Sequence, residues 1–178
     1  PEFSRTLAQH NRKTPRPLPD DTQLMRHLGI AIAHSQGSRS IDIAQLIETK
    51  VFSDAFCAFS IPKLARRNPN EIIRRYWKYL GRMRFRGKIG AIVKCAQVLQ
   101  SIQHDYGSFT HLLKYYKIPR RINTKEQLDL FWKGFDDLKM EMNSREMPFF
   151  RSTTSLLQLL LDLDYDSVKP DLIIMRLA

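Results

Sequence analysis

The stretch RFRGKIGAIVKCAQVLQSIQH, from Arg84 to His104, is the longest periodic segment of the chain and decides its fold class. Its apolar residues recur every three or four positions, which is the spacing of one buried face of an α-helix. They are Ile89, Ile92, Val93, Ala96, Leu99 and Ile102. Such a face needs other elements to cover it, and no part of the chain shows the alternation of a strand. The segment therefore predicts an all-α fold.

Shorter helical segments precede and follow this one. Residues 20–22 and Thr124 are of the types that cap a helix at its start, and Pro62 and Pro69 are tolerated in a first turn. Gly81 is placed to end the helix before the long one. Residues 147–163 are expected to form a further apolar helix or helical pair. We expect nine or ten helices with short connections.

Residues 1–19 differ in composition from the rest. They are polar and basic with several prolines, which predicts an extended, flexible arm. Pro1 to Phe3 is typical of a cloning remnant and carries no argument. The length of 178 residues fits one further domain, so we expect a helical domain over residues 20–178.

Charge and cysteine usage limit the classes of function. The net charge is +11 and the pI about 9.9, which indicates a polyanionic partner, nucleic acid first and an anionic membrane second. No apolar run approaches the length of about 20 residues that a membrane span needs. Cys57 and Cys95 lie far apart with no CxxC, so neither a structural zinc site nor an iron–sulfur cluster is expected. Free thiols suit a reducing compartment.

The positive charge is densest between residues 66 and 88. Nine basic residues there oppose one carboxylate, Glu71: Arg66, Arg67, Arg74, Arg75, Lys78, Arg82, Arg84, Arg86 and Lys88. Aromatic residues are interleaved with them, and basic groups with aromatics can bind phosphates and stack bases. The alternative is a solvated helix face whose aromatics belong to the core.

Motifs of other enzyme classes are missing. There is no glycine-rich nucleotide loop after a strand, no GxSxG and no HExxH. The histidines are scattered, and only His34 lies near a suspected site. Nucleophilic and metal-dependent enzymes therefore have no support in the sequence.

Three segments of the chain together resemble the motifs of a known protein family. Residues 81–99 contain a basic, lysine-bearing turn that opens a long helix with Ile, Val and Ala at set positions. Residues 30–38 contain a turn with Gln36. Residues 147–171 place Pro148, Thr154 and Asp171 at the spacing of a hairpin proline, a second-helix threonine and a later aspartate.

Over about residues 22–178 these segments resemble the helix–hairpin–helix DNA glycosylases, the superfamily of endonuclease III and the 3-methyladenine glycosylases. The form of residues 84–92 is especially similar to 3-methyladenine glycosylase I. The resemblance implies a two-lobed helical bundle that bends double-stranded DNA and flips a damaged base into a pocket. It implies a monomer acting in the bacterial cytoplasm at the nucleoid or in a nucleus. The zinc-binding termini of glycosylase I and the cluster cysteines of endonuclease III have no counterpart here, so no zinc, iron–sulfur cluster or other cofactor is expected.

The resemblance also implies roles for individual residues. Asp171 would be the catalytic carboxylate, and Gln36 would fill the gap that the flipped base leaves. Trp132, Phe149 and Phe150 would form walls of the base pocket. The remaining expected DNA contacts are Arg84, Arg86, Lys88, Arg151, Ser152, Thr153 and Arg176.

The chain departs from the family pattern at several positions. Phe149 and Arg151 stand where the hairpin has glycines, which let phosphate approach the backbone N–H groups. Thr153 stands near the lysine nucleophile of the bifunctional members, so Schiff-base lyase chemistry is not expected. Ala33 falls about where glycosylase I has its pocket glutamate.

The sequence leaves three hypotheses. The first is a monofunctional glycosylase that hydrolyses the N-glycosidic bond of a flipped, alkylated base. The second is a catalytically inactive module of the same fold that binds DNA. The third is an unrelated basic helical protein that binds RNA or a protein. Asp171 could equally be a helix cap, Gln36 a turn cap, residues 151–153 an ordinary cap and the aromatics core.

Overall fold

The computed structural model describes residues 17–167, and all regular structure in that range is helical. The expected all-α fold is confirmed. In chain order the elements are α2 (Asp21–His34), α3 (Ser40–Ile47), α4 (Lys50–Ala55), η1 (Cys57–Phe59), α5 (Ile61–Leu64), α6 (Pro69–Leu80), η2 (Gly81–Met83), α7 (Gly87–Tyr106), α8 (Phe109–Tyr115), α9 (Lys125–Ser144) and α10 (Thr153–Asp162). The expected arm at 1–19 lies largely outside the described residues.

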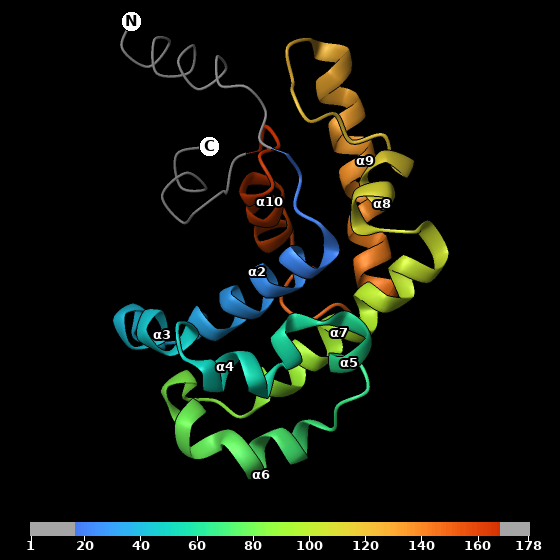
Figure 1. The fold of residues 1–178 in the computed structure, drawn as a ribbon. Coiled ribbons are helices and arrows are strands. Elements are labelled where there is room, and N and C mark those ends of the chain that lie inside the picture. The colour runs from blue at the N-terminus through green and yellow to red at the C-terminus, as the bar shows by residue number, and fades with distance from the viewer. Residues whose placement is uncertain (1–16, 168–178) are drawn as a thin grey trace, which may run out of the picture.

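Helix α7 is the centre of the fold. Its apolar residues are buried as the periodicity predicts, and α2, α5, α6 and α8 all pack against it. Figure 1 shows α3, α4 and α6 at one end of the molecule and α9 and α10 at the other, with α2 and α7 between them. Burying most of this apolar surface supplies the main driving force for folding.

The predicted caps begin the helices. Asp20 accepts a hydrogen bond from Gln23 N at 2.8 Å, and the Gln23 side chain accepts one in return from Asp20 N. The side chains of Asn68 and Thr124 likewise cap α6 and α9. These side chains satisfy backbone N–H groups that a helix leaves without partners.

Two segments are interrupted by residues that are not α-helical. The aromatics Phe52, Phe56 and Phe59 do not share one helix, because the chain leaves α4 at Phe56 and takes positive φ values from Cys57 to Phe59. The three rings then pack on one another with centroids 5.1 to 5.9 Å apart. Residues 147–163 are not one helix either, since α10 begins only at Thr153.

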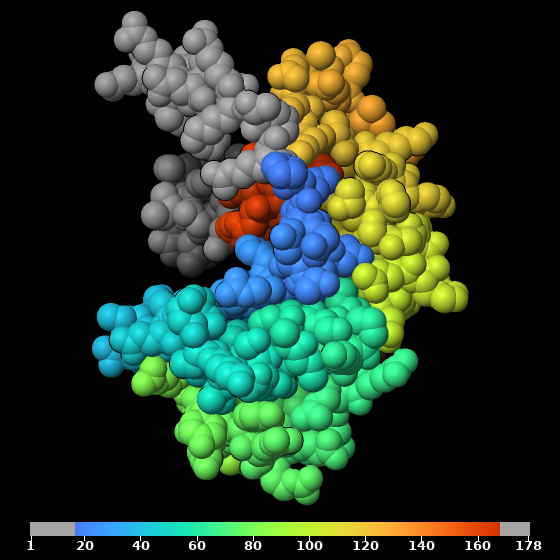
Figure 2. Space-filling view, in the orientation of Figure 1, coloured from blue at the N-terminus to red at the C-terminus, as the bar shows by residue number. Residues whose placement is uncertain are grey.

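Helix α10 lies against α2. His27 Nε2 of α2 is 3.0 Å from Asp162 Oδ2 of α10. The space-filling view shows the two helices in contact, and it shows α6 forming the far end of the molecule (Figure 2). Between residues 17 and 167 no helix has the length and apolarity to cross a bilayer.

Candidate DNA interface

Helices α9 and α10 form the predicted helical hairpin, joined by a turn over residues 145–152. Met147 N donates to Met142 O at 2.9 Å, and Phe150 N donates to Pro148 O at 2.7 Å. Phe149 has φ 64°, a left-handed conformation that glycine adopts without steric cost. Arg151 has no such φ, so its backbone is open to any residue. Of the two residues that stand in place of the family's glycines, Phe149 therefore strains the turn and Arg151 does not.

The strain at Phe149 gives a testable prediction. Phe149→Gly and Phe149→Ala both remove the ring, but only glycine relieves the left-handed φ. We expect Phe149→Gly to exceed Phe149→Ala in free energy of unfolding by about 1 kcal/mol, the reverse of the usual order. Urea denaturation of the pair measures this difference. Equal stabilities, or a more stable alanine variant, would show that the turn is not strained there.

The start of α10 has the features of a phosphate site. Ser152 caps the helix by accepting from Ser155 N, and Arg151 and Ser152 are exposed. Lys139 Nζ donates to Thr153 Oγ1 at 2.8 Å, and Asn143 Nδ2 donates to Arg151 O at 3.3 Å. A helix N-terminus combines free N–H groups with a positive dipole end. Lys139 adds a charge there that the sequence offered no reason to select.

The turn after α2 is built around Lys88. The Lys88 side chain is 1% exposed, and its ammonium donates to Ala33 O at 3.0 Å, to Ser38 Oγ at 2.8 Å and to Ser35 O. These contacts satisfy carbonyls at the C-terminal end of α2. Burial and the Arg84 charge lower the pKa of Lys88 from its ordinary value. The expectation that Lys88 contacts DNA is corrected, because its donors are used inside the protein.

Gln36 and Arg84 are exposed beside this buried lysine. Gln36 has φ 49° and Gly37 φ 72°, so the turn makes two successive left-handed steps. The Arg84 guanidinium lies 3.8 Å from where a Cβ would stand on Gly37. Arg86 is also exposed and stacks over the Trp77 ring, 5.4 Å from its centroid. The structure thus places the Arg84 guanidinium beside the turn that carries Gln36.

Helix α7 joins the two turns. Lys88 holds the 33–38 segment, while Cys95 Sγ lies 3.9 Å from Pro148 O and Lys94 Nζ 3.4 Å from Glu146 Oε2 of the hairpin. Lys88 and Cys95 are seven residues apart, which puts them on one face of α7 and about 10 Å apart along its axis. Two turns far apart in the sequence therefore lie along one side of α7.

Cys95 makes the stability of this region dependent on pH. Burial raises the pKa of its thiol well above the ordinary value of 9.0, so the folded protein keeps a proton that the unfolded chain releases. Stability from this group is complete below pH 9 and is lost as pH rises. Between pH 9 and 10 we expect the free energy of unfolding to fall about 1 kcal/mol more in wild type than in Cys95→Ala. Parallel pH profiles would contradict this.

The expected aromatic pocket is only partly assembled. Phe150 is buried in the core, and Phe149 packs partly buried against it. Trp132 is 45% exposed and packs edge-on against Phe131 and Phe135. It precedes Asn143, the residue that contacts the hairpin turn, by eleven residues, or about 16 Å along α9. Trp132 is therefore not brought beside Phe149 and Phe150.

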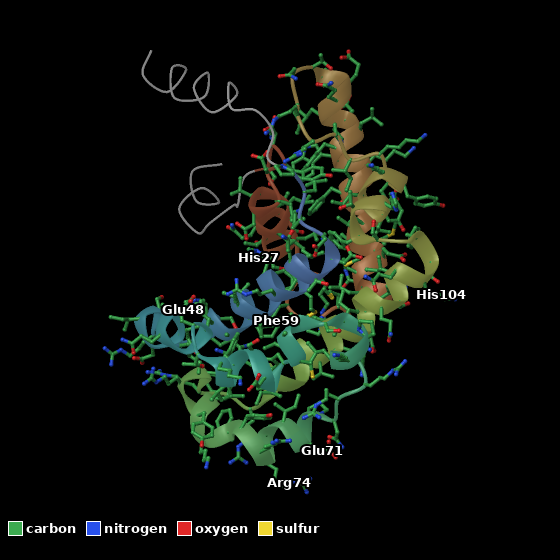
Figure 3. The ribbon with its side chains drawn as sticks, in the orientation of Figure 1. His27, Glu48, Phe59, Glu71, Arg74 and His104 are labelled. Carbon is green, nitrogen blue, oxygen red and sulfur yellow. The ribbon has the colours of Figure 1, made fainter. Side chains whose placement is uncertain are left out.

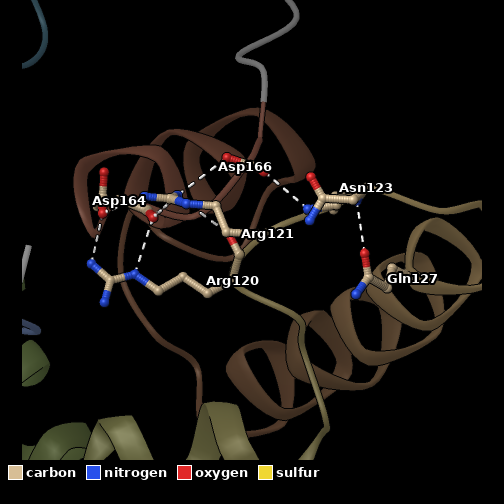
Figure 4. Close-up of polar contacts among 7 residues, drawn as sticks. Arg120, Arg121, Asn123, Gln127, Asp164 and Asp166 are labelled. Carbon is tan, nitrogen blue, oxygen red and sulfur yellow. Dashed lines mark hydrogen bonds and ion pairs between the residues drawn. The ribbon is translucent and has the colours of Figure 1, made fainter. Parts of the chain in front are cut away.

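Asp171 and Arg176 lie outside the described residues, but the chain that leads to them is held firmly. Arg120 and Arg121 both reach Asp164 Oδ2, at 2.7 and 2.8 Å. Arg121 Nη1 also lies 3.2 Å from Asp166 Oδ1 (Figure 4). Backbone contacts complete the cluster, since Asp166 N donates to Arg120 O and Ile122 N to Asp166 Oδ2.

Sequence reasoning missed this cluster. No spacing rule connects an Arg-Arg pair after Ile118-Pro119 with two aspartates more than forty residues later. The sequence feature that could have indicated a separate role for Arg120 and Arg121 is their distance from the dense basic stretch at residues 66–88. Over residues 17–167 no group of His, Cys, Asp or Glu has the arrangement of a metal site.

Comparison with known proteins identifies relatives in sequence and in fold. The methyladenine glycosylase family model matches residues 4–156. Two solved structures of 3-methyladenine DNA glycosylase I from Staphylococcus aureus, one of them a glutamate-to-glutamine mutant, superpose with a TM-score of 0.61 at 23% identity. The alignments cover 93% of this chain and 92% and 91% of those chains. A tyrosine-to-phenylalanine mutant of 3-methyladenine DNA glycosylase I, in complex with 3-methyladenine, matches with the same TM-score and identity. No curated protein matches the sequence.

The structural likeness confirms the two-lobed glycosylase fold, and the family match covers well over half of the chain. The chain therefore belongs to the methyladenine glycosylase family, whose members are DNA glycosylases of base-excision repair.

Proposed function

We propose that the protein is a monofunctional N-glycosylase that removes a cationic alkylated purine, 3-methyladenine first, from double-stranded DNA. The observation that carries the proposal is that the Gln36 turn and the hairpin turn that leads into α10 are both held on one face of α7, through Lys88 and Cys95. A related glycosylase of the same fold was solved in complex with 3-methyladenine. We expect the protein to act as a monomer wherever cellular DNA lies.

In this proposal the 33–38 turn and the 145–152 hairpin turn bind the DNA backbone on either side of the lesion. Arg151, Ser152 and the first N–H groups of α10 would bind a backbone phosphate, with Lys139 close to the same helix end. Arg84 and Arg86 would hold phosphates near the Gln36 turn. Gln36, which is exposed at the turn, would occupy the space left by the flipped base.

The chemistry assigned to Asp171 is hydrolysis. A base alkylated on its ring carries a positive charge and leaves readily with the electrons of the N-glycosidic bond. The Asp171 carboxylate would stabilise the oxocarbenium-like sugar and accept a proton from the water that attacks C1′. The products are a free base and an abasic site. The role of Asp171 rests on its spacing from Pro148, since the matched family range ends at residue 156.

Because Ala33 stands about where glycosylase I has its pocket glutamate, the base must be recognised without a carboxylate from this position. Ala33 is fully buried, and its carbonyl oxygen accepts from Lys88, so this position supplies no carboxylate to a pocket. Phe149 is then the most accessible of the proposed aromatics at the hairpin turn, where a ring can stack on a cationic base. Trp132 has no part in this proposal, because α9 carries it away from the turn.

The catalytically inactive DNA-binding module remains the second candidate. Phe149 at a left-handed hairpin position and the missing glutamate at Ala33 favour it. The test is release of free base from methylated duplex DNA, followed by chromatography of 3-methyladenine and 7-methylguanine. Release with multiple turnovers supports the glycosylase. DNA binding without release from methylated, deaminated or oxidised duplexes would leave the binding module.

A further inference from the structure

Helix α6 presents a charged surface that the proposed interface does not use. The α6 basic face consists of four exposed residues of α6 and η2: Arg74, Arg75, Lys78 and Arg82. Glu71 is the only carboxylate between residues 66 and 86. In Figure 3 the Arg74 side chain points away from the body of the molecule, and Figure 2 shows α6 forming that end of the surface.

Folding leaves these charges without ionic partners. Some arginines elsewhere pair with carboxylates, Arg121 with Asp164 and Arg145 with Glu141 for example. No residue of the α6 basic face forms a salt bridge with any described carboxylate, and Arg82 donates only to the neutral Gln45. Like charges placed together on a helix are destabilising. The face therefore gains no ion-pair stabilisation from the described residues and is suited to an external anion.

Aromatic rings fix the cations in place. Lys78 Nζ lies 4.7 Å from the Tyr79 ring centroid, and the Arg75 guanidinium lies 5.4 Å from that of Tyr76. Arg86, a residue of the proposed DNA interface, stacks on Trp77 of α6 at 5.4 Å. This contact places one cation of the proposed interface directly against α6.

The chemistry of the face favours DNA over a membrane. A helix that binds a lipid surface buries its own apolar side in the bilayer. The apolar side of α6 is already used, because Ile72 and Leu80 are fully buried in the protein core. A helix of twelve residues is about 18 Å long, which corresponds to about five base-pair steps of B-DNA.

We propose that the α6 basic face binds backbone phosphates of the DNA that flanks the lesion site. The bound duplex then runs from the two turns on α7 past Arg84 and Arg86 and along α6. This inference rests on the proposed function only for the position of the lesion, since the face would bind the phosphates of undamaged DNA equally well. It adds about three phosphate contacts without sequence preference.

The test measures the salt dependence of binding to an undamaged duplex of about 25 base pairs, long enough to span the turns and α6, by fluorescence anisotropy. The variant carries Arg74→Gln, Arg75→Gln and Lys78→Gln, which keep helix propensity and touch only exposed side chains. The control carries Lys114→Gln, Lys125→Gln and Lys133→Gln, which remove the same charge from exposed positions on α8 and α9.

We expect the slope of log Kobs against log salt to fall by about 2.7 in the α6 variant, with at least about tenfold weaker binding near 0.1 M salt. The control should keep a slope close to that of wild type. Equal slopes for the two triple variants would overturn the proposal. So would loss of binding to phosphatidylserine vesicles in the α6 variant with DNA affinity unchanged. Because no base is released, failure of the glycosylase assay does not affect this result.

Discussion

Asp171→Asn is expected to lower the rate of base release by about a thousandfold or more while leaving DNA binding nearly intact. Asparagine has the same shape but carries no negative charge, so it can neither accept a proton from water nor stabilise a cationic sugar. The measurement is a single-turnover rate on methylated duplex DNA, in which chemistry is separated from product release. Affinity for the same duplex is measured in parallel.

The matched control for this prediction is Asp129→Asn. Asp129 is an exposed aspartate on α9, and its replacement removes the same charge. We expect its rate to stay within about twofold of wild type, as for a typical surface substitution. If Asp171→Asn released base as quickly as the control, Asp171 would be a helix cap and another group would carry the reaction. If both variants and wild type bound DNA without release, the binding module would be the function.

Lys88→Met is expected to reduce the free energy of unfolding by about 3 kcal/mol. Methionine fills a similar volume, so the loss comes from the polar partners and not from a cavity. The carbonyls of Ala33 and Ser35 and the hydroxyl of Ser38 lose their donor, and each buried group without a partner costs about 1–3 kcal/mol. Removing a buried charge from a desolvated site offsets part of this cost.

Lys94→Met on the same helix is the control. Lys94 makes one 3.4 Å ion pair with Glu146, and its side chain is 40% exposed. Such a pair contributes less than about 1 kcal/mol. Urea denaturation should therefore separate the two variants clearly. A Lys88→Met protein as stable as Lys94→Met would mean that the 33–38 turn does not depend on the lysine.

Loss of Lys88 is also expected to affect the DNA interface. With its three contacts gone, the turn that carries Gln36 is no longer tied to α7, although Gln36 and Arg84 keep their chemistry. At a temperature where both variants are folded, we expect Lys88→Met to bind methylated duplex more weakly than Lys94→Met. That result would make Lys88 a positioning residue, which differs from the direct phosphate contact that its place in a basic turn suggested.

Much of the fold follows from local rules that the sequence states directly. The periodicity of residues 84–104 predicts α7 and its buried face. The capping residues Asp20 and Thr124 and the first-turn residue Pro69 mark three helix starts correctly. These signals are reliable because a helix is defined by contacts between residues three or four positions apart. The resemblance in three segments likewise led to the family whose model matches most of the chain.

The candidate site depended more on long-range packing. The sequence predicted Lys88 to be an exposed DNA contact because its neighbours are basic, whereas folding buries it. The sequence also placed Trp132 beside Phe149, since composition does not show how far α9 extends from the hairpin. Asp171 and Arg176 remain predictions from spacing.

The sequence by itself determined the helical class, the helix starts, the basic character and the family, because each depends on neighbours along the chain or on totals over it. Only the tertiary structure decided which charges are available. It turned Lys88 inward, paired Arg120 and Arg121 with aspartates more than forty residues away, and left Arg74, Arg75 and Lys78 facing solvent. The physical reason is that a charge is satisfied or free according to what folding brings within about 4 Å of it.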